Sequence, residues 1–166
     1  MFEKGLSVFY PFHGSGQIVD IEEKEVLGEK REYLIIEFPL TNTKVMLPVN
    51  NLPSTGLRLL ATKKMIKQSF DILASDGDVN AFDWKQRYKL HTEMIKSGRI
   101  LDIAEVIRNL HRRNIVKELS STEKKLYNDA LDMIAGEISV VLTKDSEEIR
   151  TEIEAILNTH APKIDD

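Results

Sequence analysis

The chain contains a single tryptophan, and cations follow it closely. Trp84 is succeeded by Lys85, Arg87 and Lys89. An aromatic ring can wedge into or stack on a base step while neighbouring cations hold the phosphate backbone. The chemistry that these residue types could perform together is therefore contact with nucleic acid.

A second interpretation of Trp84 stays open at the level of sequence. If this segment is helical, Trp84, Tyr88, His91 and Ile95 share one side of the helix. Such a pattern is typical of an ordinary core face, and tryptophan is mostly buried in folded proteins. The exposure of Trp84 distinguishes the two: an exposed ring favours a wedge, and a buried ring favours a structural role.

No segment matches a catalytic or metal-binding motif. The segment His13-Gly14-Ser15-Gly16 is rich in glycine but lacks the Lys-Ser or Lys-Thr of a phosphate loop, and it predicts a tight hairpin instead. The four histidines share no ligand spacing and there is no cysteine. Asp76-Gly77-Asp78 lacks the later ligands of a calcium loop and predicts a turn between helices. We therefore expect no enzyme activity, no catalytic residues, no metal and no cofactor.

Composition describes an ordinary globular protein whose charge is unevenly distributed. The 166 residues are 42% hydrophobic and carry a net charge of −4, yet residues 84–125 hold 11 basic and 5 acidic side chains. A basic surface of this kind can meet phosphates, although a solvated helix surface with paired charges is the simpler alternative. The N-terminus does not resemble a secretory signal, and no apolar run approaches the length of a membrane span. We expect a cytoplasmic protein with no membrane contact.

The elements that position these residues follow two different periods. Before residue 61, short apolar runs separated by Gly, Pro and Asn predict strands at 7–10, 16–21, 33–38, 45–48 and 57–60. After residue 61, apolar residues at helical spacing predict helices at about 62–74, 83–96 and 100–116, a fourth after Ser120, and a last short helix ending near Asn158. Ser120 and Glu123 predict a capping box in which Glu123 reaches back to the helix start. We therefore predict an α+β chain, with a small Tudor/SH3-like β-barrel over residues 1–60 and an all-helical domain over 61–166.

Six segments resemble, in order, the motifs of the CarD-like (CarD/CdnL) bacterial transcription regulators. Residues 8–16 resemble the opening Y-P-x-H-G-x-G, and residues 84–89 resemble the W-x-x-R-Y motif. The other four segments are residues 32–34, 44–51, 104–113 and 119–125. The resemblance covers residues 2 to about 142 and spans the change from strand to helix.

The resemblance implies a regulator that bridges two partners. Residues 1–60 would bind RNA polymerase on the lobe and protrusion of its β subunit, and residues 61–166 would contact promoter DNA at the upstream edge of the transcription bubble. Such a protein stabilises the open complex, binds DNA largely independently of sequence and takes no small-molecule substrate. The family motifs place polymerase contacts at Lys24, Lys44, Met46 and Pro48, and DNA contacts at Trp84, Lys85, Arg87 and Lys89.

Three positions depart from the family pattern. Met46 stands where relatives carry a basic residue, Gln86 stands where a basic residue is frequent, and His111 replaces a frequent bulky aromatic. Met46 therefore predicts an apolar contact with polymerase. A protein–protein adaptor, with a β-barrel interaction domain and no direct DNA role, is the alternative function. The acidic segment after Lys144 is either a cap on the helices or a separate mobile segment.

Overall fold

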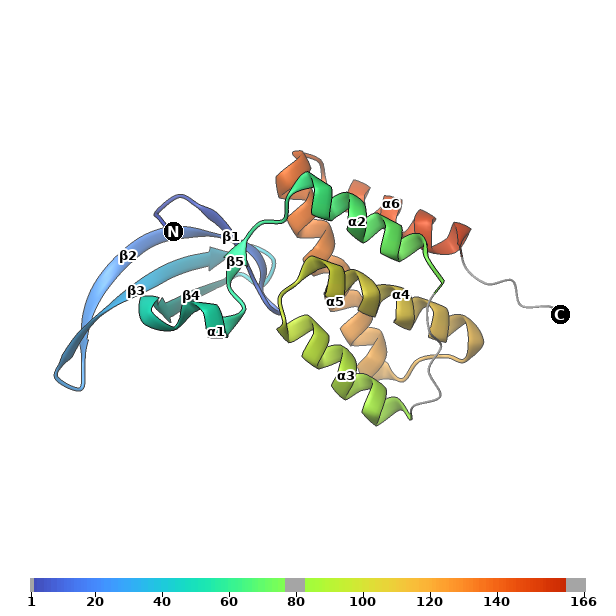
Figure 1. Ribbon diagram of the computed structural model, residues 1–166, viewed down its shortest axis with the longest axis horizontal. Helices are drawn as coiled ribbons and strands as arrows, with labels where there is room; N and C mark the ends of the chain where they lie inside the picture. The colour runs from blue at the N-terminus through green and yellow to red at the C-terminus, as the bar shows by residue number, and fades with distance from the viewer. Residues whose placement is uncertain (1, 77–82, 161–166) are drawn as a thin grey trace.

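The computed structural model describes residues 2–76 and 83–160, in which a strand-rich part precedes a helical part (Figure 1). Gly77 and Asp78 of the predicted interhelix turn lie outside the described residues. Five antiparallel strands form one sheet in the order β4-β3-β2-β1-β5. They are β1 Ser7–Tyr10, β2 Gly14–Val26, β3 Glu29–Phe38, β4 Thr43–Pro48 and β5 Arg58–Leu59. The predicted α+β class, a Tudor-like sheet followed by helices, is confirmed.

The β2–β3 hairpin extends well beyond the predicted strands and projects as a two-stranded ribbon (Figure 1). Its tip is the pair Leu27 and Gly28, whose φ angles of 54° and 81° suit a two-residue hairpin turn. The predicted strand ends at Ile21 because the residues that follow are mostly charged and place these charges on both faces of the hairpin. Backbone pairing, continuous from Ile21 to Val26, carries the ribbon without the apolar alternation that marks a half-buried strand.

The connection from β4 to β5 contains two short helices that the sequence did not predict. Residues Val49–Asn51 form the 3₁₀ helix η1, and Leu52–Thr55 form the short helix α1. Gly56 ends α1 with a φ of 82°, a conformation that glycine adopts without strain. The fifth strand is consequently shorter than the predicted 57–60.

Four of the five long helices begin at a side-chain cap. The five are α2 Lys63–Ala74, α3 Trp84–Lys96, α4 Ile100–Val116, α5 Ser121–Leu142 and α6 Ser146–Thr159, and α4 is the one that does not begin at such a cap. Thr62, Asp83, Ser120 and Asp145 each accept a hydrogen bond from a backbone N–H of the first turn. In the segment after Lys144, the apolar face of α6 is fully buried, so α6 covers the helical bundle.

Two hydrophobic cores meet at strand β1. Val8 belongs to the core enclosed by the sheet, with Ile18, Ile36 and Phe38. Phe9, on the opposite face of the same strand, is fully buried among the residues of the helical core. Successive strand residues point to opposite faces, so one strand supplies both cores. The predicted division into residues 1–60 and 61–166 stays a prediction, and Phe9 shows that the helical core draws on both sides of it.

Candidate nucleic-acid and protein interfaces

Trp84 lies at the first position of α3 and is 44% exposed. Asp83 caps the helix there, its Oδ1 accepting from the backbone N–H of Gln86 at 2.8 Å. The predicted apolar side of the helix buries His91 and Ile95 but stops short of Trp84. The ring is therefore exposed, which favours the wedge interpretation over a structural role in the core.

Lys85 and Lys89 are exposed on the same helix, and neither forms an ion pair within the described residues. The Lys85 ammonium lies 5.9 Å from the centroid of the Trp84 ring, within range of a cation–π contact. The structure thus brings together one open aromatic face and two uncompensated positive charges. Three of the four predicted DNA contacts share this surface.

Arg87, the fourth predicted DNA contact, is placed differently. It is 6% exposed, and its Nε and Nη2 each donate to one carboxylate oxygen of Glu123 at 2.7 Å. The hydrogen bond to Glu123 raises the pKa of Arg87, which stays charged. This guanidinium is covered by protein and holds α3 to α5, so its predicted contact with DNA stays a prediction that its burial disfavours.

The same contact corrects the predicted capping box at the start of α5. The Ser120 Oγ accepts from the Glu123 backbone N–H at 3.2 Å, as predicted. The Glu123 side chain is fully buried and accepts from Arg87 instead of reaching back to the helix start. One half of the box is present, and its carboxylate serves a contact between helices.

A second polar residue is buried where α3 packs against the other helices. His91 is 1% exposed, and its Nε2 lies 3.4 Å from the Asn109 side-chain nitrogen. Burial, assisted by the positive charge of Arg87, lowers the pKa of His91 to about 4, although Glu123 opposes the shift. His91 is therefore neutral at pH 7. Helix α3 thus buries two polar side chains, Arg87 and His91, beside Ile95. Tyr88 and Met94 pack partly buried against the same core.

A hollow of about 460 Å³ lies beside Trp84, between α3 and the turn that joins α4 to α5. Arg113 and Lys117 line it, and neither forms an ion pair in the described part of the chain. Sequence reasoning missed both as site residues. Arg113 ends one of the segments that carry the family resemblance, which was the available signal, but nothing in the sequence places either residue next to Trp84.

The excess of basic residues in 84–125 divides into two groups. Some are neutralised: Lys124 pairs with Glu118, and Lys125 pairs with Asp129 at 2.7 Å. Arg112 is 1% exposed and donates to the backbone oxygen of Leu157. The unpaired cations named above gather around Trp84. The basic window is thus a surface of paired charges in one part and an open cationic surface, within the described residues, in the other.

The four predicted polymerase contacts project from one face of the sheet. In the register of β3 and β4, Lys44 lies opposite Glu37 and Pro48 lies opposite Tyr33. Tyr33 in turn lies opposite Glu22 on β2, and Lys24 follows Glu22 by two residues. Paired residues of an antiparallel ladder point to the same side, as do residues two apart. Lys24, Lys44, Met46 and Pro48 therefore share a face. We call the part of it formed by Lys44, Met46 and Pro48 the β4 surface.

The β4 surface is accessible and mixed in character. Strand β4 is at the edge of the sheet, and Met46 is 43% exposed. Lys44 forms a cross-strand ion pair with Glu37 at 3.5 Å, and both side chains are exposed. Lys24 pairs with Glu22 at 3.7 Å. An apolar side chain thus lies beside charges that solvent already screens.

Within residues 2–76 and 83–160, no cluster of His, Asp and Glu side chains is suited to holding a metal ion. None of the helices in those ranges has the length and hydropathy needed to cross a bilayer.

Comparison with known proteins assigns both parts of the chain. Residues 2–60 match the family model described as the CarD-like/TRCF RID domain, and residues 68–154 match the C-terminal domain of CarD. The Bacillus subtilis (strain 168) protein named "Putative transcription factor YdeB" is 37% identical over 141 residues, which are 85% of this chain and 92% of that protein. A Tudor-like sheet joined to a helical bundle with these matches defines a transcription regulator. The chain belongs to the CarD-like family.

Proposed function

We propose that this regulator binds RNA polymerase through the β4 surface and promoter DNA through the first turns of α3, and that it thereby stabilises the open complex. The observation that carries the proposal is the exposure of Trp84, a lone tryptophan among cations that form no ion pair with the residues the structure describes. The site of action would be the bacterial cytoplasm, where polymerase and promoter meet.

The polymerase side rests on the chemistry of an edge strand. An edge strand presents unpaired backbone groups that can extend a sheet of a partner, while its side chains supply specificity. The partner we propose is the β subunit, on its lobe and protrusion. Met46 would supply the apolar centre of this contact, flanked by Lys44 and Pro48, and Lys24 would reach it from the β2–β3 ribbon.

The DNA side rests on stacking and on charge. The Trp84 ring can fill a distorted base step at the upstream edge of the bubble, and Lys85 and Lys89 can hold the flanking phosphates. Arg113 and Lys117 extend the positive surface across the hollow beside the ring. Phosphate contacts carry no base information, so binding would be weak in the free protein, sensitive to salt and largely independent of sequence.

The adaptor without a DNA role would have no need of this arrangement. An adaptor whose helices only support the sheet would bury its tryptophan to gain the free energy of transferring a large ring from water. The exposed ring supports the DNA role over the adaptor.

Two variants of the full chain test the two contacts separately. Met46→Glu places a carboxylate in an apolar contact, and we expect polymerase binding in a pull-down to weaken by about 100-fold or more. Trp84→Ala removes one stacking partner worth about 1–3 kcal/mol, so open-complex lifetime should shorten about five- to hundredfold. The unfolding free energy of Trp84→Ala should change by no more than about 0.5 kcal/mol.

Conservative variants serve as matched controls. Met46→Leu should keep polymerase binding, and Trp84→Phe should keep part of the open-complex lifetime because a ring remains. The proposal fails if Trp84→Ala leaves the lifetime unchanged on a promoter with an unstable open complex. It fails equally if Met46→Glu binds polymerase as tightly as Met46→Leu.

A further inference from the structure

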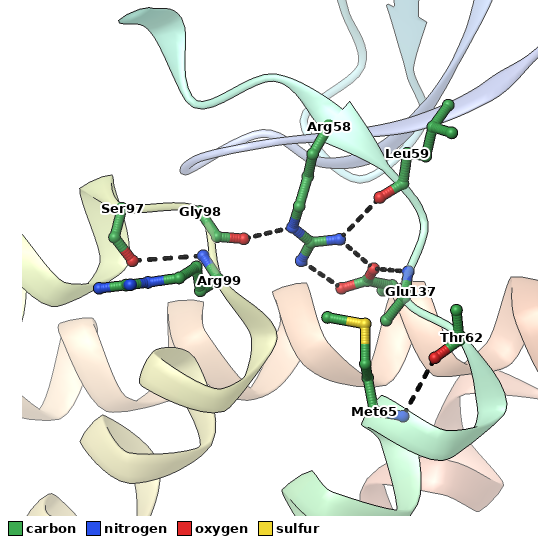
Figure 2. Close-up of polar contacts among 9 residues, drawn as sticks. Arg58, Leu59, Thr62, Met65, Ser97, Gly98, Arg99 and Glu137 are labelled. Atoms are coloured by element: carbon green, nitrogen blue, oxygen red, sulfur yellow. Dashed lines mark hydrogen bonds and ion pairs between the residues drawn. The ribbon is translucent and has the colours of Figure 1, made fainter. Parts of the chain in front are cut away.

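A fully buried carboxylate joins the sheet to the helices (Figure 2). Glu137 of α5 is 0% exposed. Its Oε2 accepts from Arg58 Nη1 at 2.5 Å and from the Ala61 backbone N–H at 2.8 Å, and its Oε1 accepts from Arg58 Nη2 at 2.8 Å. Both oxygens are thus bound by the segment that leaves the sheet. We call Arg58, Glu137 and the Ala61 N–H the junction cluster.

Arg58 extends this cluster to a third element. Its Nε donates to the backbone oxygen of Gly98, in the turn between α3 and α4 (Figure 2). Its guanidinium also lies 4.3 Å from the centroid of the Phe9 ring, which is buried in the helical core. One side chain of β5 therefore contacts β1, α5 and the turn between α3 and α4 together.

The backbone is packed too closely at this point for the turns to slide. A Cβ on Gly98 would lie 2.7 Å from the Gly56 oxygen, and a Cβ on Gly56 would lie 3.1 Å from the Lys96 oxygen. Glycine at both positions lets the turn after α1 touch the turn after α3 directly. The junction cluster thus acts on a contact that is already tight.

The geometry of α3 makes this contact important for Trp84. Arg58 bonds to the turn that follows α3, and Trp84 begins this helix, about 18 Å from its last residue at 1.5 Å per residue. Because Arg87 and Glu123 hold α3 to α5, the helices would move together, and a rotation of about 10° about the junction would move Trp84 by about 3 Å, close to the roughly 3.4 Å spacing of bases along a strand. Small rotations at the junction would therefore displace the ring by a whole base step.

We propose that Glu137 and Arg58 are positioning residues that set the distance and angle between the β4 surface and Trp84. The part of this inference that concerns Trp84 on DNA rests on the function proposed above. In this view the sheet and the helices act as one rigid spacer between polymerase and DNA. A tether between two independent domains would instead let Trp84 sample many positions.

The rigidity can be measured without either partner. Because the chain has no cysteine, Thr43→Cys on β4 and Glu93→Cys on α3 provide the two sites for spin labels, and both positions are exposed. Double electron–electron resonance on the full chain should give one narrow distribution of distances between the labels. Adding Glu137→Gln should at least double the width of that distribution or shift its centre.

Two further variants keep the measurement decisive. Arg58→Lys retains the charge but loses the planar fork that bonds both oxygens of Glu137, so it should broaden the distribution even if Glu137→Gln folds poorly. Asp132→Asn is the matched control, since it removes an ion pair of the same helix α5 that joins α6 rather than the sheet. Folded Glu137→Gln and Arg58→Lys proteins with the parental distribution would overturn the proposal.

The role in positioning is tested by open-complex lifetime on unlabelled protein. Arg58→Lys should shorten the lifetime at least fivefold, while its affinities for polymerase and for free DNA each stay within twofold. A merely structural residue would lower both affinities together. A broadened distribution with an unchanged lifetime would overturn the positioning role. If Trp84→Ala itself has no effect in this assay, the proposed function fails, and the distance measurement alone still decides whether the junction is rigid.

Discussion

Strand β4 and helix α3 each display candidate contact residues, but they do so by different physical means. On β4, Lys44 and Met46 are exposed because alternate residues of a strand face the same side. On α3, Lys85 and Arg87 are only two residues apart, yet one is in solvent and the other is 6% exposed. A strand motif thus maps directly onto a surface, whereas a helix motif wraps around its axis and divides between surface and core.

The two regions also differ in how they are held. Strand β4 is fixed by its backbone ladder to β3 and by apolar residues such as Leu47 in the sheet core. Helix α3 is fixed by apolar residues such as Ile95 and also by the buried Arg87–Glu123 ion pair and neutral His91. The stability of buried polar contacts depends on charge and pH far more than that of apolar contacts does. Helix α3, which carries Trp84, should therefore be more sensitive than strand β4 to pH and to substitutions that remove a charge.

The largest effect that would test this difference comes from Arg87→Ala. Removal of one partner leaves the buried Glu123 carboxylate without its bidentate donor, which costs about 3–5 kcal/mol of unfolding free energy. For a chain of this size that lowers the melting temperature by roughly 6–20 °C. Thermal melting followed by circular dichroism checks the prediction.

Lys89→Ala is the matched control on the same helix. It should change the unfolding free energy by no more than about 0.5 kcal/mol, because Lys89 is exposed and unpaired in the described structure. If Arg87→Ala melted like Lys89→Ala and weakened DNA binding instead, Arg87 would return to the DNA contacts.

A somewhat smaller effect concerns pH. The pKa of His91 is about 4 in the folded protein and near 6.5 when unfolded, so between these values the unfolded chain binds the additional proton. The stabilisation is complete above about pH 6.5 and decreases as the pH falls, by about 3 kcal/mol at pH 4. Urea unfolding from pH 8 to pH 4 should show this loss in the parent and a shallower profile in His91→Gln.

Exposed His160 offers the comparison for this measurement. Because its side chain is exposed, His160→Gln should change the unfolding free energy by no more than about 0.5 kcal/mol. Burial also lowers the pKa of His111, so part of the acid sensitivity will remain in His91→Gln. Profiles of equal steepness in parent and His91→Gln would show that His91 is not buried in its neutral form.

The smallest effect distinguishes unpaired from paired cations. Each lysine that contacts a phosphate adds about 0.9 to the slope of log affinity against log salt. Lys117→Ala should therefore lower that slope by about one and weaken DNA binding for all sequences alike. Lys125→Ala should leave it unchanged because Asp129 already neutralises this charge. Equal slopes for the two variants would remove the hollow beside Trp84 from the DNA surface.

The sequence predicted the fold class, the helix starts and most strand positions, because these depend on local features. A cap such as Asp83 bonds within its own first turn, and apolar spacing reports which side of an element is covered. The β2–β3 ribbon was underestimated, since paired charged strands lack that spacing. Trp84 was identified from its residue type and its neighbouring cations, the β4 residues came from the family resemblance, and the structure added where each side chain lies.

The sequence by itself determined the period of each segment, the caps, the absence of cysteine and the order of the family motifs. Only the tertiary structure decided that Arg87 is buried while Trp84 is exposed, that Arg113 lies across a hollow from Trp84, and that Glu137 joins sheet to helices. The reason is the distance along the sequence over which each kind of contact acts. Caps and periodicity act over about four residues, whereas Arg58 and Glu137 are 79 residues apart and meet only when β5 packs against α5.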